Sequence, residues 1–571
     1  MIKRTGFPPG AEREITEVLG IRVVDRDGRI WVGPKFPQDQ MARAIYYSRM
    51  GGFVPPEVAV DTILTNPLHY GAGGFEGIRA VRTRYGDGFV ELPSNIARFV
   101  FSSLAFNLSL VNQTKALLED PNIEHVEHLQ RIPREFFADS ERAVREGDEI
   151  KMGVTIFRKD GSTEKVTVPF RLKVRFDNEE KVFSLKEMEA AICSLAFLND
   201  LVREGEFSAD QLEIILGGYF RPFFWVSGEE GLRVPTLFRR EKGSPLLDKP
   251  LYFAIATLPW GLYLDDKGYR EGLDVLIAPL PRIDESMPVT QKIAGNYVNC
   301  ARNVNIAMRL GFGEILVTNH KGEIVEGSAE NIVVLMTNKR TGEMVAYCPP
   351  LSSNILAGTN RDRVLRILEQ GLEVSGKKVK LVMKAPKKKA MIDALAGDSV
   401  WEVSAVVMMG TGVGIIHIRS ITDNPALKDW MGCNELRSEE SEATPLFLRR
   451  ISETEKKYLV NNGQRHPFVD ALKKAYDEFV LAENGRRITP AYCMDYEALE
   501  RVLGVGMDEF ANREFRHKVG AGHFNERIDG LKHPEEIHSR TREVAAALRR
   551  AIDISYQRRC KGRYPELALR R

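Results

Sequence analysis

Apolar and polar residues alternate most strictly between residues 150 and 174. Apolar side chains occupy every second position in two stretches, Ile150, Met152, Val154, Ile156 and then Val166, Val168, Phe170, Leu172, Val174. The residues between them include Lys-Asp-Gly-Ser at 159–162, which is typical of a tight turn. The pattern predicts a β-hairpin. The strongly charged segment before it, 119–149, is expected to be helical, and the whole of 110–182 is predicted to be an inserted α+β module.

Elsewhere in the first half of the chain, apolar runs predict strands and helical spacing predicts helices. The predicted strands are 27–33, 75–83, 213–228 and 250–260, and the predicted helices are 91–108 and 183–202. Pro93 and Ser94 favour a helix start near the beginning of 91–108.

The second half of the chain alternates between the two kinds of element. A helix is predicted at 297–311, where Gly311 ends the pattern, and Val298, Ala301, Val304 and Met308 form one apolar stripe along it. Strands are predicted at 313–319, 323–327, 331–336 and 401–421, the last interrupted by glycines at 410–414, and a loop followed by a helix lies at 352–372. Beyond residue 428, Phe468, Leu472 and Phe479 mark one amphipathic helix and Val544, Leu548 and Ile552 mark another.

Composition and charge narrow the class of protein. The chain has 571 residues, 43% hydrophobic and 28% charged, with a formal net charge of +2. This profile is typical of a globular protein with more than one domain and gives no sign of a nucleic-acid or membrane partner. Six scattered cysteines without metal-ligand spacing predict neither a disulfide framework nor a metal site. With no apolar signal segment and no membrane-length run, the expected location is the cytoplasm.

Two glycine-rich stretches raise the question of a nucleotide site. A dinucleotide-binding fold needs a G-x-G-x-x-G loop that opens a helix. The stretch 71–77 lacks this spacing and leads into a strand, and 410–414 lies between two strands. The dinucleotide interpretation is therefore weak. Tight turns, or loops whose backbone N–H groups approach a phosphate, both remain open.

Seven short motifs occur in an order that resembles one family. They are LHYGAGGFEGIR (68–79), YFRP (219–222), LPWGLY (258–263), KIAGNY (292–297), VEGSAENIVV (325–334), SSNILAGTNRD (352–362) and MGTGVG (409–414). This order resembles the fold-type IV aminotransferases, which use pyridoxal 5′-phosphate, and specifically the branched-chain amino-acid aminotransferases. The resemblance covers about 60–430, interrupted by the insertion.

The resemblance implies a two-domain α+β fold, D-amino-acid aminotransferase-like. The expected parts are a small N-terminal domain at 1–257, an interdomain loop at 258–266, a large cofactor-binding domain at 267–427 and a helix-rich extension at 428–571. The cofactor is expected between the two domains, and the protein is expected to form at least a homodimer.

The resemblance also implies a set of cofactor residues. Lys292 matches the Schiff-base lysine, Tyr297 the tyrosine that meets the ring's phenolic oxygen, and Glu326 the carboxylate beside the ring nitrogen. The phosphate would be held by residues that match the rest of the family's site, namely Arg98, Gly358, Thr359, Asn360, Gly410 and Thr411. The family commonly has threonine where Asn360 stands.

For the substrate, the resemblance implies an apolar pocket with one arginine. Tyr70, Phe75, Trp260 and Tyr263 match its hydrophobic walls, and Gly412 lies in the loop beside it. Tyr219 matches a residue serving the α-carboxylate, and Arg221 one that meets the distal carboxylate of glutamate. Phe223, Phe224 and Trp225 are interpreted as core.

The implied activity is transfer of the amino group of leucine, isoleucine or valine to 2-oxoglutarate. Alternatives are a fold-type IV transaminase for another amino acid or amine, an aminodeoxychorismate lyase, and a non-catalytic scaffold. A scaffold has no physical need for Lys292, Tyr297, Glu326 and Arg98 together.

Overall fold

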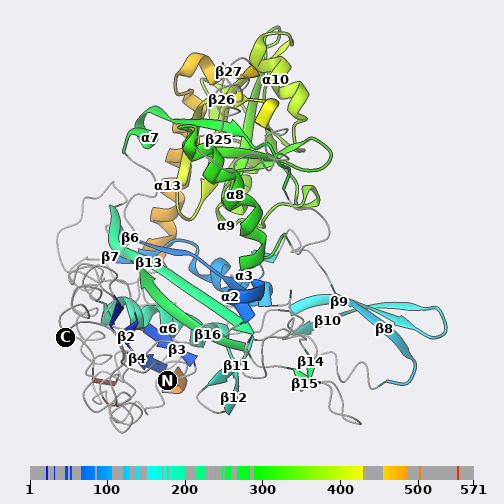
Figure 1. Cartoon of the computed structure of the whole chain (residues 1–571), viewed down its shortest axis with the longest axis vertical. Helices are drawn as coiled ribbons and strands as arrows, with labels where there is room; N and C mark the ends of the chain where they lie inside the picture. Colours follow the sequence, from blue (N-terminus) through cyan, green and yellow to red (C-terminus); the bar gives the residue numbers. More distant parts are fainter. Residues whose placement is uncertain are drawn as a thin grey trace, which may run out of the picture. The chain divides into compact units, whose positions relative to one another are not determined.

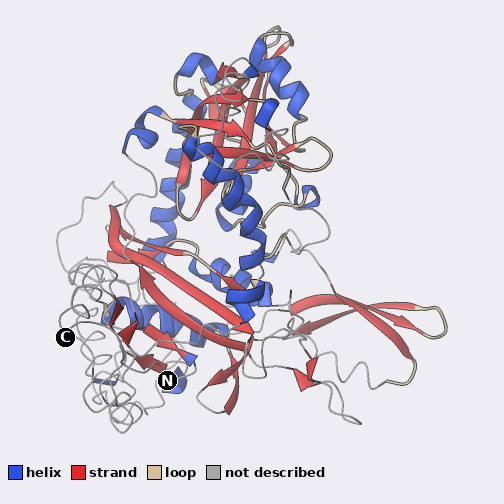
Figure 2. Ribbon diagram, viewed as in Figure 1, coloured by secondary structure: helices blue, strands red, loops and turns tan. Residues whose placement is uncertain are grey.

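The computed structural model divides into two compact units, each with its own sheet (Figure 1). Unit 1 comprises residues 1–127, 140–261 and 483–571, and unit 2 comprises residues 128–139 and 262–482. The structure describes residues 21–22, 31–32, 45–48, 52–54, 66–83, 86–103, 105, 120–128, 136–137, 139, 151–169, 172–176, 179–199, 213–226, 238–239, 247–248, 251–258, 266–282, 289–427, 454–486, 500–502, 550–551 and 554. Both units mix helices and strands, so the fold is α+β as the resemblance implies (Figure 2).

Unit 1 is built on a nine-stranded sheet in which distant segments of the chain pair. Its path is β12-β11-β16-β13-β6-β7, with β3 and β5 attached to β16 and β13, and β4 attached to β3. The strands are β3 (Ile45–Tyr47), β4 (Gly52–Val54), β5 (Gly73–Phe75), β6 (Ile78–Thr83), β7 (Gly86–Phe89), β11 (Leu172–Phe176), β12 (Glu179–Phe183), β13 (Glu213–Val226) and β16 (Leu251–Leu258). The fully buried rings of Phe220, Phe224 and Phe253 lie in its core, and Trp225 is buried too, as expected from the sequence.

The helices of unit 1 are α2 (Asn66–Tyr70), α3 (Leu92–Ser103) and α6 (Leu185–Leu198). Ser184 begins α6 with a reciprocal cap: its Oγ accepts from the backbone N–H of Glu187, and the Glu187 carboxylate accepts from the backbone N–H of Ser184. The helix α3 contacts α6 and is buried along almost its whole length. Its polar side chains therefore need partners inside the unit.

A separate three-stranded sheet, β10-β9-β8, accounts for much of the predicted insertion. The strands β9 (Lys151–Arg158) and β10 (Thr163–Pro169) form the predicted antiparallel hairpin. Two details of the prediction were wrong. The strand β8 (Ile123–His128) lies where a helix was expected, because pairing within the sheet outweighs local helical preference. The second stretch of alternation divides after Pro169, and its later part, β11, joins the main sheet.

Unit 2 contains a second nine-stranded sheet, ordered β19-β18-β17-β26-β25-β20-β21-β24, with β27 paired to β26. The strands are β17 (Leu273–Ile277), β18 (Glu314–Thr318), β19 (Ile324–Glu326), β20 (Asn331–Asn338), β21 (Met344–Cys348), β24 (Lys380–Met383), β25 (Trp401–Gly410), β26 (Gly414–Asp423) and β27 (Lys456–Leu459).

The other described strands form short two-stranded pairs. These are β1 (Ile21–Arg22) with β2 (Trp31–Val32) and β14 (Phe238–Arg239) with β15 (Leu247–Asp248) in unit 1, and β22 (Glu373–Val374) with β23 (Lys377–Lys378) in unit 2.

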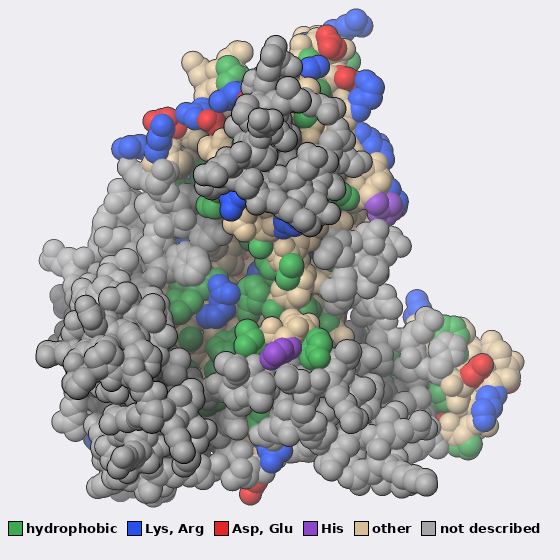
Figure 3. Space-filling view, viewed as in Figure 1, with side chains coloured by type: hydrophobic (Ala, Val, Ile, Leu, Met, Phe, Trp, Pro, Cys, Tyr) green, Lys and Arg blue, Asp and Glu red, His purple; other side chains and the backbone are tan. Residues whose placement is uncertain are grey.

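The helices of unit 2 pack beside this sheet. They are α7 (Asp266–Glu271), α8 (Tyr297–Arg309), α9 (Thr359–Gln370), α10 (Lys388–Ala396) and α13 (Pro467–Arg486), with 3-10 turns η4 (Ala294–Asn296), η5 (Leu351–Ser353) and η6 (Val460–Gly463). On the face of unit 2 seen in Figure 3, Asp and Glu side chains lie among the Lys and Arg side chains. Among the described residues, no helix combines the length and apolar character needed to span a bilayer, and no three His, Cys, Asp or Glu side chains are grouped to hold a metal ion.

The helix α8 confirms the predicted helix and ends two residues before the predicted end, but most of its apolar stripe lies at the surface. Val298 is 71% exposed and Met308 is 62% exposed, so the apolar stripe does not face the core. The buried residues are Cys300, Asn303, Ile306 and Ala307.

The late helix α13 lies where the first amphipathic pattern of the extension predicts it. Phe468 and Leu472 are fully buried, and Phe479 is partly buried. The second pattern, around Val544 and Leu548, lies outside the described residues.

Candidate active site

Lys292 lies directly before the turn η4 that leads into α8. Its Nζ donates a hydrogen bond of 2.9 Å to the hydroxyl of Tyr297, the first residue of α8. Both side chains are partly buried. The single 3-10 turn between them brings the amine and the phenol together.

Glu326 is at the end of β19 and is 2% exposed. Its Oε2 accepts from the backbone N–H of Leu356 at 3.1 Å and from Asn331 Nδ2 at 3.5 Å. Its Oε1 is in ion-pair contact with Nη1 of Arg282. Burial lowers the pKa of the Arg282 guanidinium below its usual range. The carboxylate is thus fixed from both sides.

The segment before α9 is joined to both of these groups. Asn331 Nδ2 also donates to the carbonyl of Leu356 at 3.0 Å, so that one amide holds the strand end and the segment together. The backbone N–H of Ala357 donates to the carbonyl of Thr290, two residues before Lys292, at 3.4 Å. A Cβ on Gly358 would collide with Asn331 Oδ1, so this close approach requires glycine.

Gly358 is the N-cap of α9 and provides no side-chain cap. The first two helical residues, Thr359 and Asn360, are 3% and 4% exposed. A helix N-terminus presents backbone N–H groups and a positive dipole end, which together favour an anion.

The glycine turn between β25 and β26 lies over the end of the VEGSAEN motif. Gly410 pairs with Gly414 across the hairpin, with Thr411 and Gly412 in the turn. A Cβ on Gly410 would lie 3.5 Å from the carbonyl oxygen of Ala329 and 3.5 Å from Glu330 Cγ. The contacts therefore bring the predicted unit 2 residues into one region of that unit.

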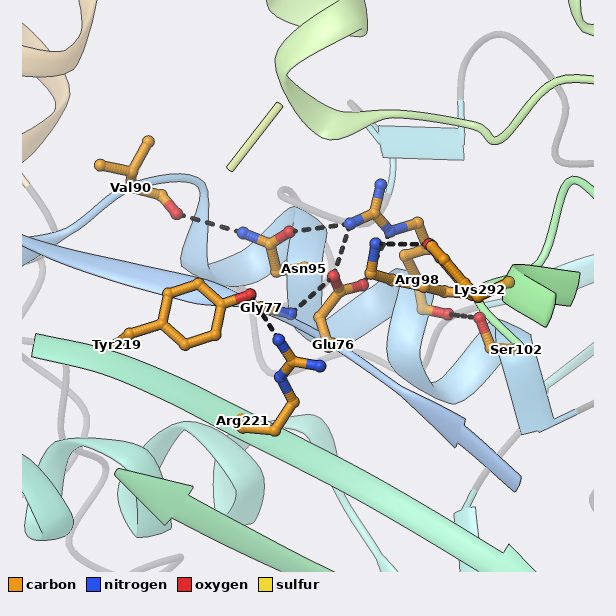
Figure 4. Close-up of polar contacts among 10 residues, drawn as sticks. Glu76, Gly77, Val90, Asn95, Arg98, Ser102, Tyr219, Arg221 and Lys292 are labelled. Carbon is orange, nitrogen blue, oxygen red and sulfur yellow. Dashed lines mark hydrogen bonds and ion pairs between the residues drawn. The ribbon is translucent and has the colours of Figure 1, made fainter. Parts of the chain in front are cut away.

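In unit 1, three predicted substrate residues lie together. Nη2 of Arg221 donates to the Tyr219 hydroxyl at 3.0 Å (Figure 4). The Arg221 guanidinium also lies 4.6 Å from the centre of the Phe75 ring. Arg221 and Tyr219 are two residues apart on β13 and therefore share a face of the strand. A cation stacked on an aromatic ring remains directed at whatever anion its edge meets.

Arg98 is buried on α3 and paired with a carboxylate that the sequence analysis did not single out. Its Nε donates to Glu76 Oε2 at 2.7 Å and its Nη2 to Oε1 at 2.5 Å, while Asn95 Oδ1 lies 3.4 Å from Nη2 (Figure 4). Glu76 is 0% exposed and also accepts from the backbone N–H of Gly77. The only sign of Glu76 in the sequence is its position beside a glycine between two short strands.

The other residues predicted to form the hydrophobic walls of the substrate pocket are Tyr70, Trp260 and Tyr263. Tyr70 ends α2, is 44% exposed, and lies beside the ring of His69. Trp260 and Tyr263 lie outside the described residues.

A second group missed by the sequence analysis is a pair of buried carboxyls in unit 2. Glu314 and Glu330 are 6% and 4% exposed, and the charge of Glu314 acts on Glu330. Glu314 also accepts from the Ser328 hydroxyl at 2.9 Å and from the backbone N–H of Ile315 at 2.7 Å. Burial, reinforced by the charge of Glu314, raises the pKa of Glu330 to about 8. The pair therefore retains a proton near neutral pH.

This proton makes the stability of the protein depend on pH. The folded carboxyl titrates near 8 and the unfolded one near its ordinary value of 4.5, so between these values the folded chain holds the extra proton. We expect the Glu330 contribution to the free energy of unfolding to be complete below pH 4.5 and to be lost as the pH rises toward 8. Urea unfolding at pH 5 and pH 8 measures this, and Glu330→Gln should show a smaller fall than the wild type.

Groups such as His417 titrate in both proteins, so the comparison isolates Glu330. Glu402→Gln, at an exposed position on β25, is the matched control and should keep the wild-type fall. An unchanged fall in Glu330→Gln would contradict the assignment of the proton to this pair.

The comparisons with known proteins agree with the motifs. Residues 183–421 match the model of the amino-transferase class IV family. The branched-chain-amino-acid aminotransferase of Escherichia coli K12 is 25% identical over 209 residues, covering 36% of this chain and 57% of the relative. A probable branched-chain-amino-acid aminotransferase of Aquifex aeolicus is 29% identical over 200 residues, covering 35% of this chain and 61% of the relative.

Among solved structures, the branched-chain amino acid aminotransferase of Escherichia coli has a TM-score of 0.46 and 17% identity, covering 78% of this chain and 96% of that chain. The sequence match spans only 57% of the length of the E. coli relative. The match of the family model is continuous from β12 to β26 and includes Lys292, Tyr297 and Glu326. The match to the class IV aminotransferase family thus extends over residues 183–421 of this chain.

Proposed function

We propose that the protein is a pyridoxal-phosphate-dependent transaminase that moves the amino group of leucine, isoleucine or valine to 2-oxoglutarate. The observation that carries the proposal is the hydrogen bond from Lys292 Nζ to Tyr297, in the same unit as a buried carboxylate, Glu326, and a helix N-terminus suited to an anion. The E. coli and Aquifex relatives carry the branched-chain name.

The chemistry of the donor groups fits this cofactor. Backbone N–H groups at Gly358–Asn360 and the hydroxyls of Thr359 and Thr411 suit a phosphate. The packing at Gly358 leaves no room for a Cβ, because a Cβ there would collide with Asn331 Oδ1. Glu326 is buried and held by Arg282 and two N–H donors, which suits a carboxylate that meets a pyridinium nitrogen. Arg98 remains a proposed phosphate ligand, with two of its nitrogens already on Glu76.

In the proposed mechanism, Lys292 moves the proton. Pyridoxal phosphate, when bound, supplies an electron sink for the pair left when the Cα–H bond of the amino acid breaks. The Lys292 amine would take the Cα proton of the amino acid at Nζ and hold it for return. The Tyr297 hydroxyl holds Nζ in position, and Glu326 favours a proton on the ring nitrogen.

For substrate recognition, the proposal assigns Arg221 to the second carboxylate of glutamate and 2-oxoglutarate. The Phe75 ring keeps the guanidinium on an apolar surface, and the Tyr219 hydroxyl fixes one of its nitrogens. Because Nε of Arg221 is buried without a hydrogen-bond partner among the described residues, the group has donor capacity left for a carboxylate. An aliphatic side chain would lie against the same aromatic surface.

The test is an absorbance spectrum of the purified protein with pyridoxal phosphate. We expect a yellow band that bleaches on addition of L-leucine and returns with 2-oxoglutarate. A band that ignores L-leucine but bleaches with a D-amino acid or another amine would keep the cofactor and replace the substrate. A protein that stays colourless with added pyridoxal phosphate would overturn the enzyme proposal in favour of a scaffold.

The proposal includes a cytoplasmic location and at least a homodimer. The scarcity of cysteines fits a reducing compartment, and the exposed apolar side chains of Val298 and Met308 on α8 offer surface for association. A monomer in sedimentation equilibrium at micromolar concentration would contradict the dimer.

A further inference from the structure

A polar contact joins the late helix α13 to the start of α9. The hydroxyl of Tyr476 donates to Oδ1 of Asn360 at 2.9 Å, and the two residues are 6% and 4% exposed. Asn360 is the second helical residue of α9, after the N-cap Gly358 and Thr359. The contact therefore lies inside the unit, within the first turn of the helix proposed to hold the phosphate.

The two ends of a side-chain amide have opposite effects at an anion site. The Nδ2 end donates and attracts an anion, whereas Oδ1 only accepts and repels it. A hydroxyl that donates to Oδ1 fixes the amide with its oxygen toward α13. This leaves Nδ2 as the end that is turned away from α13.

This chain needs such a partner because it has asparagine at this position. A threonine hydroxyl rotates to donate where an acceptor lies, but an amide must be held in one of two orientations. A second residue therefore determines the direction in which the Asn360 amide donates. Tyr476 comes from a part of the chain more than a hundred positions later.

The helix α13 is held in place independently of this hydrogen bond. Phe468 and Leu472 are fully buried, and the Arg363 guanidinium of α9 lies 3.1 Å from the centre of the Phe479 ring. The Tyr476 ring is itself buried, so removing its oxygen leaves the packing of the helix in place. The hydroxyl can thus be tested apart from the helix.

We propose that Tyr476 is a positioning residue for the cofactor phosphate, which it serves by orienting the Asn360 amide so that Nδ2 donates at the N-terminus of α9. This inference rests on the proposed function, since it presupposes that the phosphate of pyridoxal phosphate binds there. It gives the segment around 467–486 a role in the site that the sequence did not reveal.

The experiment compares the binding of pyridoxal 5′-phosphate and of pyridoxal, which lacks the phosphate, to wild-type and Tyr476→Phe apoprotein by absorbance titration. We expect Tyr476→Phe to raise the dissociation constant for pyridoxal phosphate about 3- to 10-fold, the effect of one neutral hydrogen bond. Its affinity for pyridoxal should stay at the wild-type value. Equal weakening for both compounds, or no weakening for either, would overturn the inference.

A double-mutant cycle with Asn360→Thr separates orientation from general packing. Because threonine needs no external partner, adding Tyr476→Phe to Asn360→Thr should change the affinity for pyridoxal phosphate by less than about twofold. The same loss in both backgrounds would overturn the inference. Phe479→Leu, which alters α13 away from Asn360, is the matched control and should leave the ratio between the two compounds unchanged.

The same titrations distinguish a failure of the proposed function from a failure of the role proposed for Tyr476. If wild-type protein bound neither compound, the cofactor assignment itself would be wrong. If it bound pyridoxal phosphate normally and Tyr476→Phe did too, only the role of Tyr476 would be lost.

Discussion

Lys292→Ala is expected to abolish transamination, with kcat lowered by about 10⁴-fold or more, the upper end of what a positioned general base contributes. In the proposed function two duties rest on this one amine, which would hold the cofactor covalently and carry the proton. Tyr297, its hydrogen-bond partner, carries a phenol and no amine, so it cannot form the covalent bond to the cofactor in place of Lys292. The measurement is the rate of the L-leucine and 2-oxoglutarate reaction, together with the yellow band, which should be absent.

The control for this variant is Lys321→Ala. Lys321 is exposed in the turn before β19, so its loss should leave the rate and the spectrum unchanged. Adding a small primary amine such as ethylamine should restore part of the rate in Lys292→Ala but have no effect on the wild type, because a free amine can replace the lost proton carrier. Activity within tenfold of the wild type in Lys292→Ala would show that another group performs the chemistry.

The sequence predicted those parts of the site that are local in the chain. Lys292 and Tyr297 are separated by one 3-10 turn, so the motif that contains them also determines their contact. The same holds for Arg221 and Tyr219, two positions apart on one strand. In each pair, helix or strand geometry alone brings the side chains together.

The residues that were missed depend on pairings between distant segments. Glu76 meets Arg98 from a position 22 residues earlier, Asn331 reaches Leu356 across 25 positions, and Tyr476 reaches Asn360 across 116. No periodicity records such contacts. What the sequence does offer is a polar residue beside a glycine at a buried strand end, which is where Glu76 and Glu326 both lie.

The helix α8 shows that a correctly predicted helix can bury a face other than its apolar stripe. The apolar positions Val298 and Met308 are exposed, while Asn303 is fully buried. Asn303 tolerates burial because its Nδ2 donates to the carbonyls of Leu280 and Asn299, each at 3.3 Å. Hydrophobic periodicity counts an asparagine as a surface residue and cannot anticipate partners from another element.

Glu76→Ala is expected to destabilise the surroundings of α3 by about 3–5 kcal/mol, the cost of leaving a buried charge without its partner. Arg98 is 2% exposed and Glu76 is 0% exposed, so no water replaces the lost carboxylate. Because the chain has two compact units, hydrogen exchange read peptide by peptide is the suitable measurement. Amides of α3 should exchange faster, while those of β20 in the other unit serve as an internal reference and should not change.

The control that tests whether burial causes the destabilisation is a more exposed ion pair in the same unit. Arg158 and Glu164 are joined at 2.6 Å between β9 and β10, but the Glu164 side chain is exposed and that of Arg158 is only partly buried, so Glu164→Ala should have little effect on exchange. The double variant Glu76→Leu/Arg98→Met should recover much of the loss, since an apolar pair of similar volume removes both charges at once. If α3 exchanged as slowly in Glu76→Ala as in the wild type, Arg98 would not depend on Glu76.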